Sequence, residues 1–160
     1  MTKIERDMLS IAAEFAVASE LGRRNIYAQP TFGHLKKTDL LIFGNRGKLL
    51  KIEAKGKQGK QWPNCKGIPD NNSVMVLVDF AGKTDKDRPD FYVLTLDDWL
   101  TFVKNLIRKY PGKRIELDSE NVPVWKDQVK GGKPYRGTGI DVSDVAQHIE
   151  RWEKIAKLLK

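Results

Sequence analysis

Three charged residues lie at the ends of two strand-like apolar runs that a tight turn separates. Asp39 comes before the first run, and Glu53 and Lys55 end the second. Two carboxylates on neighbouring strands repel each other unless a divalent cation lies between them, and ligation by oxygen alone suits Mg²⁺ or Mn²⁺. A lysine beside such an ion can position a water molecule and stabilise the charge that grows on a pentavalent phosphate. The three residues therefore indicate a site for phosphodiester hydrolysis.

The turn between the two runs decides whether the carboxylates meet. If residues 45–46 form a two-residue turn, Asp39 faces Ile52, and Glu53 lies on the opposite side of the sheet. One extra loop residue, or a bulge, places Asp39 directly across from Glu53. Gly47 suits the positive-φ position of a three-residue turn, so we expect an irregular turn or a bulge near it.

Glu53 and Lys55 are two residues apart, so in a strand they point to the same face, and Ala54 points to the opposite layer. The small side chain of Ala54 suits a closely packed layer on the opposite face of the sheet. An exposed salt bridge on a hairpin is the alternative interpretation of these charges.

The segments on either side of this hairpin predict alternating helices and strands. Apolar residues recur at helical spacing before the stop signal Gly22, and further strands are expected at 26–29, 73–80 and 91–94. A helix should follow from the N-cap Thr95 to about residue 110. The stripe of the first helix consists of Ile4, Met8, Ile11, Ala12, Phe15, Ala18 and Leu21.

The last third of the chain shows a weaker pattern. Glycines accumulate between residues 113 and 140, which predicts loops or short excursions around 122–125. A final helix is expected from Asp141 or Ser143 onward, with an outer surface of i,i+4 pairs such as Glu150 with Lys154. Its apolar face packs on the domain's own sheet or forms a dimer seam.

Composition limits the function classes. The 160 residues carry a net charge of +8, which favours a polyanionic partner, nucleic acid or a membrane surface, over general solubility alone. One cysteine and two distant histidines exclude a zinc cluster built from thiolate and imidazole ligands. The sequence has no run of 18 apolar residues and no signal-peptide pattern, so we expect a soluble, cytoplasmic protein without a membrane partner.

The hairpin resembles a known family signature. Asp39, an apolar strand, a turn and then Ile52-Glu53-Ala54-Lys55 are similar to the PD-(D/E)xK nuclease motif, with Thr38 at the proline position. Upstream, Ala13-Glu14-Phe15 and the run from Glu20 to Asn25 resemble the first helix of archaeal-type Holliday junction resolvases. The similarity covers about residues 4 to 95.

This resemblance implies a restriction endonuclease-like α/β fold of three layers, with a central mixed β-sheet flanked by helices. Residues 1–160 would form a single nuclease domain, with a catalytic core at about 4–95 and a helical and loop addition at about 96–160. The implied activity is that of a Mg²⁺-dependent DNA endonuclease acting as a homodimer. Junction resolution is preferred slightly over type II restriction, and a nucleic-acid-binding or structural module that has lost catalysis is the alternative.

The same resemblance assigns roles to the site residues. Asp39, Glu53 and the carbonyl of Ala54 would hold Mg²⁺, for which Mn²⁺ can substitute, and Glu14 would complete the shell or bridge to it through water. Lys55 would orient the attacking water. From the residues alone, Glu14 is also compatible with a solvated charge at the edge of the helix stripe.

Two basic, glycine-containing loops should emerge at the same edge as the carboxylates. Lysines on such loops bind phosphates, and glutamines can reach base edges. Solvated surface charge is the alternative for these loops and for a second basic stretch at 130–136. The candidate nucleic-acid contacts are His34, Lys36, Lys37, Lys57, Gln58 and Lys60.

Overall fold

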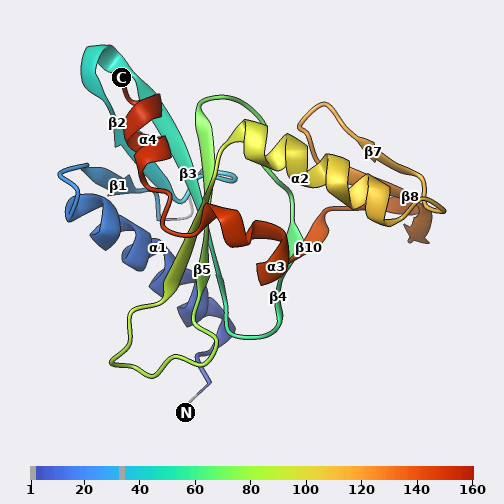
Figure 1. Cartoon of the computed structure of the whole chain (residues 1–160), viewed down its shortest axis with the longest axis horizontal. Coiled ribbons are helices and arrows are strands. Elements are labelled where there is room, and N and C mark those ends of the chain that lie inside the picture. The colour runs from blue at the N-terminus through green and yellow to red at the C-terminus, as the bar shows by residue number, and fades with distance from the viewer. Residues whose placement is uncertain (1–2, 33–34) are drawn as a thin grey trace.

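The computed structural model describes residues 3–32 and 35–160. A five-stranded mixed sheet forms the centre (Figure 1). Only the pair in the middle of the sheet is parallel, and the other neighbouring strands are antiparallel. The strands follow the order β1 (Ala28–Pro30), β2 (Leu40–Phe43), β3 (Leu49–Lys57), β5 (Ser73–Asp79) and β6 (Asp90–Leu94).

Strand β5 is buried on both faces and therefore shows how the layers are built. Val74 and Val76 lie in the core shared with helix α1 (Arg6–Gly22). Met75 and Leu77 lie in the core shared with helix α2 (Leu96–Lys109). The alternation places helices on both sides of the sheet, which is the three-layer α/β class expected from the sequence.

Helix α1 packs through a different face from the one expected. Its buried apolar residues are Ala13, Val17 and Leu21, which face the sheet. The helix crosses Gly56 of β3 so closely that an added Cβ there would lie 3.1 Å from the Cβ of Ala13. Because small side chains allow this close approach, three large residues of the expected stripe are left exposed: Met8, Ile11 and Phe15.

The glycine-rich segment 113–140, which was expected to form loops, supplies four of the five strands of two further small sheets. One small sheet has three strands, β7 (Ile115–Leu117), β8 (Pro123–Lys130) and β9 (Lys133–Arg136). Another pairs β4 (Gln61–Cys65) with β10 (Thr138–Asp141). Trp125 and Ile140 join the core under α2, so the expectation of loops there was wrong.

The expected C-terminal helix is also broken. It consists of α3 (Val142–Val145), a 3₁₀ turn (Ala146–His148) and α4 (Glu153–Leu158). Glu150 has a positive φ of 55° and pairs with Arg88 at 2.7 Å, while Lys154 pairs with Asp98 at 2.7 Å. These long-range pairs replace the expected i,i+4 pair.

The apolar face of this last segment is covered by the chain itself. Trp152 packs against Phe91 of β6, with ring centroids 5.3 Å apart, and Ile155 is fully buried in the same core. Packing on its own sheet was therefore the correct alternative to a dimer seam. Among the described residues, no helix has both the length and the apolar character needed to cross a membrane.

Candidate active site

The turn between β2 and β3 sets the register of the candidate site. The amide of Gly44 donates to the carbonyl of Lys48 at 2.8 Å, and a short 3₁₀ turn (Asn45–Gly47) lies between them. Gly47 has a φ of 77°, as expected for an irregular turn at this glycine. The strands pair Leu40 with Ile52, which is the register of the longer turn. The two-residue alternative is thereby excluded.

Asp39 lies at a local irregularity just before β2. Its amide donates to the carbonyl of Ile52 at 2.8 Å, although Ile52 is already the pairing partner of Leu40. Its carboxylate Oδ2 accepts a hydrogen bond from the amide of Ala54 at 2.7 Å. The Asp39 side chain is therefore held over β3 beside Glu53, in keeping with the tendency of strand irregularities to re-aim a functional side chain.

Glu53 and Lys55 lie on one face of β3. The ammonium of Lys55 is 3.0 Å from Oε1 of Glu53, and the two side chains are 26% and 14% exposed. Ala54 points the other way, into the core beneath α1. This confirms the shared face and leaves a half-buried acid–base pair next to the Asp39 carboxylate.

Burial and mutual repulsion shape the electrostatics here. Burial raises the pKa of Asp39, against the lowering effects of the Ala54 amide and of Lys55. Burial also raises the pKa of Glu53, and the charge of Asp39 raises it further against the effect of Lys55. Burial would lower the pKa of Lys55, but Glu53, Cys65 and Asp39 together outweigh it, so the pKa is raised. Two crowded carboxylates with raised pKa values form a site that a cation would stabilise.

Glu14 comes from α1, which covers the opposite face of the sheet. Burial raises its pKa, the charge of Asp39 raises it further, and the hydroxyl of Ser10 donates to it at 3.5 Å. Glu14 is thus within electrostatic range of Asp39. Within residues 3–32 and 35–160, however, no three His, Cys, Asp or Glu side chains gather closely enough to hold a metal ion. The expected convergence of Glu14 with the other two carboxylates is not seen.

The donor set nevertheless fits a hard divalent ion. Asp39 and Glu53 supply carboxylate oxygens, and the Ala54 carbonyl belongs to the residue between Glu53 and Lys55. Mg²⁺ commonly binds one or two carboxylates and keeps several waters, so two carboxylates are sufficient protein ligands for it.

Two of the expected nucleic-acid contacts have structural roles instead. Lys57 is buried, with its ammonium 2.7 Å from Asp79, 3.1 Å from the carbonyl of Gly59 and 4.7 Å from the centre of the Trp62 ring. The Gln58 side chain bonds both the amide and the carbonyl of Ile4, at 3.1 and 2.7 Å. The expectation that these two residues face a nucleic acid was wrong, because β3 continues through Lys57 and turns its side chain inward.

The remaining candidates differ in their surroundings. Lys36 and Lys60 are exposed, and Lys37 is half-buried and lies 3.4 Å from Glu120. His34 lies outside the described residues.

Lys66 is a cation near the site that the sequence pattern did not single out. Its ammonium donates to the backbone carbonyl of Arg136 and lies 5.7 Å from the Tyr135 ring centre. Burial lowers its pKa, and the charges of Arg136, Lys37 and Lys55 lower it further. These four residues, Lys37, Lys55, Lys66 and Arg136, are called the basic cluster below. Its assembly depends on the pairing of β4 with β10, which no periodicity in the sequence indicates.

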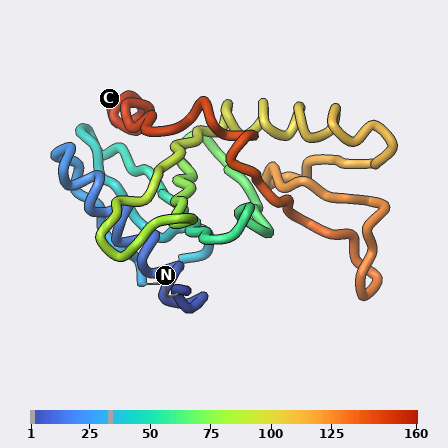
Figure 2. The backbone as a smooth tube through the Cα atoms, turned by 60° about the horizontal axis from the view of Figure 1, so that its bottom comes forward, coloured from blue at the N-terminus to red at the C-terminus, as the bar shows by residue number. Residues whose placement is uncertain are grey.

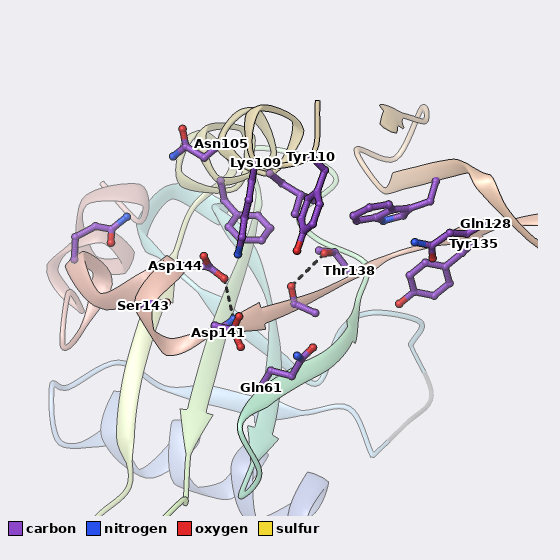
Figure 3. Close-up of a pocket in the computed structure, with 15 residues that line it drawn as sticks. Gln61, Asn105, Lys109, Tyr110, Gln128, Tyr135, Thr138, Asp141, Ser143 and Asp144 are labelled. Carbon is purple, nitrogen blue, oxygen red and sulfur yellow. Dashed lines mark hydrogen bonds between the residues drawn. The ribbon is translucent and has the colours of Figure 1, made fainter. Parts of the chain in front are cut away.

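A separate cavity of about 490 Å³ lies between α2 and the strands β8 to β10 (Figure 3). Its lining combines the aromatic rings of Tyr110, Trp125 and Tyr135 with polar side chains such as Gln61. Neither Asp39, Glu53 nor Lys55 lines it. The cavity and the carboxylate site are therefore different features of the molecule.

Comparison with known proteins gives little further help. No protein-family model matches the chain, and no curated protein matches it. Among solved structures, the chain is similar to a bacterial homing endonuclease, I-Ssp6803I, with a TM-score of 0.49 and 13% sequence identity over 96% of this chain and 93% of that chain.

Proposed function

We propose that the chain is a Mg²⁺-dependent DNA endonuclease. The observation that carries this proposal is the position of the Asp39 carboxylate, which accepts from the Ala54 amide next to Glu53, with the Lys55 ammonium 3.0 Å from Glu53. Two half-buried carboxylates and an ammonium on a basic protein suit the hydrolysis of a phosphodiester better than they suit a structural salt bridge, because burial opposes the ionisation of both acids.

Each residue has a role in this proposal. Asp39, Glu53 and the Ala54 carbonyl would hold the ion, and Glu14, which does not converge with them, would contact it only through water. Bound Mg²⁺ supplies Lewis acidity toward a phosphoryl oxygen and lowers the pKa of a water molecule. Lys55 orients the attacking water and offers positive charge to the phosphate. The basic cluster holds the DNA backbone beside these residues, because lysines and arginines that neutralise phosphates supply most of nonspecific affinity.

The resemblance of the first helix favours a four-way junction slightly over a type II restriction site. Cleavage of both strands at either substrate needs two active sites, so we propose a homodimer. The exposed apolar side chains of Met8, Ile11 and Phe15 on α1 support an interface between two copies.

Cleavage assays with four-way junctions and linear duplexes test the proposal. The wild-type protein should cut one or both in Mg²⁺ and neither in EDTA. Asp39→Asn and Lys55→Met should each lower the rate at least about 100-fold, because each removes a charge that acts on the transition state. Asp85→Asn, in an exposed loop, is the matched control and should cut at the wild-type rate.

The alternative, a binding module without catalysis, predicts a different result. Such a protein would bind DNA but leave it uncut in Mg²⁺ and in Mn²⁺. Equal cleavage by wild type and Asp39→Asn would instead contradict the assignment of the site.

A further inference from the structure

The hairpin of β8 and β9 projects from the body of the molecule. In Figure 2 the outer end of the orange segment points away from α2 and from the rest of the chain. Its register shifts between Trp125 and Val129, where β8 carries additional residues, so the outer half is set off from the inner half. Bulges of this kind bend a strand and increase its twist, which suits an arm that must reach a partner.

The inner half of the hairpin has its charges paired. Arg114 donates to Asp127 from its amide and its guanidinium at 2.9 to 3.0 Å, and Lys126 is 3.3 Å from Glu116. These pairs fix β8 against β7 and neutralise the base of the arm.

The tip has the opposite character. Lys130 and Lys133 face each other across the turn, and Gly131 and Gly132 have φ values of 60° and 76°, as a tight hairpin turn requires. In the described part of the chain no carboxylate forms an ion pair with either lysine. Like charges directly opposite on two strands destabilise a hairpin, so this arrangement suits an anionic partner. Beside them, Val129 is 61% exposed.

The base of the arm lies next to the candidate active site. Arg136, at the end of β9, accepts a hydrogen bond from Lys66 through its carbonyl. Its guanidinium is 3.6 Å from Glu120, which is also 3.4 Å from Lys37, two residues before Asp39. Arg136 also binds Asp118. A chain of ion pairs, in which acids alternate with the cations of the basic cluster, therefore connects the surroundings of Asp39 to the root of the hairpin.

We propose that the β8–β9 hairpin enters the major groove of duplex DNA and reads base edges beside the cut site. The major groove is about 12 Å wide and admits a two-stranded ribbon. Lys130 and Lys133 bind guanine acceptors, and Val129 packs against a thymine methyl group, which are contacts that distinguish base pairs. This inference rests on the proposed endonuclease function, and of its two candidate substrates it favours duplex DNA of a preferred sequence over the four-way junction.

Selection from a pool of linear duplexes with a randomised central segment tests the inference. Binding is measured in EDTA, so that no cleavage intervenes. Wild type should enrich a consensus sequence. Lys130→Ala/Lys133→Ala should bind that consensus about 10- to 100-fold more weakly and lose the preference at one or more positions, while its affinity for unrelated duplexes falls much less. Lys104→Ala/Lys157→Ala removes the same charge from α2 and α4 and should keep the consensus.

Two results would overturn the inference. The tip variant could select the same consensus as wild type, with or without a uniform loss of affinity, which would make the tip a phosphate contact at most. Alternatively, wild type could bind or cut DNA without enriching any sequence.

The test of the hairpin inference can succeed or fail independently of the proposed endonuclease activity. A protein that enriches a consensus through its tip lysines but never cuts in Mg²⁺ supports the hairpin inference and contradicts the endonuclease.

Discussion

At the scale of single residues, Lys57 was expected to contact nucleic acid but instead forms a buried ion pair with Asp79. Their charged groups are 2.7 Å apart, and both side chains are at most 10% exposed. An ion removed from water in this way depends on its partner, because an unpaired buried charge is costly.

We therefore expect Lys57→Met to lower the free energy of unfolding by about 3–5 kcal/mol, as measured by urea denaturation. Lys57→Met/Asp79→Leu should recover part of that loss, because no charge is then left alone. Lys60→Met is exposed and should change stability by less than about 0.5 kcal/mol. If Lys57→Met were as stable as wild type but bound DNA more weakly, Lys57 would be a DNA contact and not a structural residue.

The candidate site itself could be predicted at this scale because its geometry is local. The period of a strand fixes the shared face of Glu53 and Lys55, and Gly47 indicates the register that brings in Asp39. Lys57 and Lys66 could not be assigned in this way. The side chain of Lys57 faces a partner 22 residues away, and Lys66 meets Arg136 only through tertiary packing.

At the scale of elements, α2 is locked to the loop that follows β4. The ideal Cβ of Gly67 would lie 2.1 Å from the Trp99 ring, and Gly67 has a φ of 85°. The Trp99 indole in turn donates to the carbonyl of Asn121 at 2.8 Å. The loop, the helix and the start of β8 are therefore packed around one indole.

Gly67→Ala should lower the free energy of unfolding by at least about 2 kcal/mol. The new methyl group would clash with the Trp99 ring, and alanine would have to adopt the left-handed backbone conformation that glycine tolerates. Thermal unfolding followed by circular dichroism would measure the loss. Gly59→Ala is the control, since nothing lies within 4 Å of its ideal Cβ. A Gly67→Ala protein as stable as Gly59→Ala would show that Trp99 can move aside.

The elements differ in how far the sequence predicts them. Helix α2 matches expectation because its signals are local: the capping box of Thr95 and Asp98, and one apolar stripe. The C-terminal helix was wrongly expected to be continuous, since Arg88 draws Glu150 into a distant ion pair. Strands β7 to β10 were missed because their apolar and polar residues do not alternate strictly and because glycines lie in the turns between them.

At the scale of the whole molecule, Glu20 joins three distant segments. Its buried carboxylate accepts from Arg88 at 2.8 and 2.9 Å and from Arg24 at 2.7 Å, and Arg88 also binds Glu150. The network thus connects the end of α1, the loop before β6 and the C-terminal segment. The hydrogen bonds from Arg88 hold the pKa of Glu20 at about 2, below its usual value of 4.5.

A lowered pKa predicts a definite dependence of stability on pH. The contribution of Glu20 is complete above pH 4.5 and is lost as the pH falls toward 2, where the folded protein also takes up the proton. Glu20→Gln should therefore be less stable than wild type at pH 7 by about 1–3 kcal/mol, and the difference should shrink on acidification. Glu5→Gln, with an exposed side chain, is the control. A difference that stays constant from pH 7 to pH 2 would contradict this account.

The central claim is that Asp39 and Glu53 bind a divalent cation beside Lys55. A crystal of the protein soaked in Mn²⁺ tests it directly, because anomalous scattering locates the metal independently of any assay. Wild-type crystals should show a peak within coordination distance of both carboxylates and of the Ala54 carbonyl, and Asp39→Asn crystals should lack it. A wild-type crystal with no peak at these residues, or with Mn²⁺ bound only elsewhere, would contradict it.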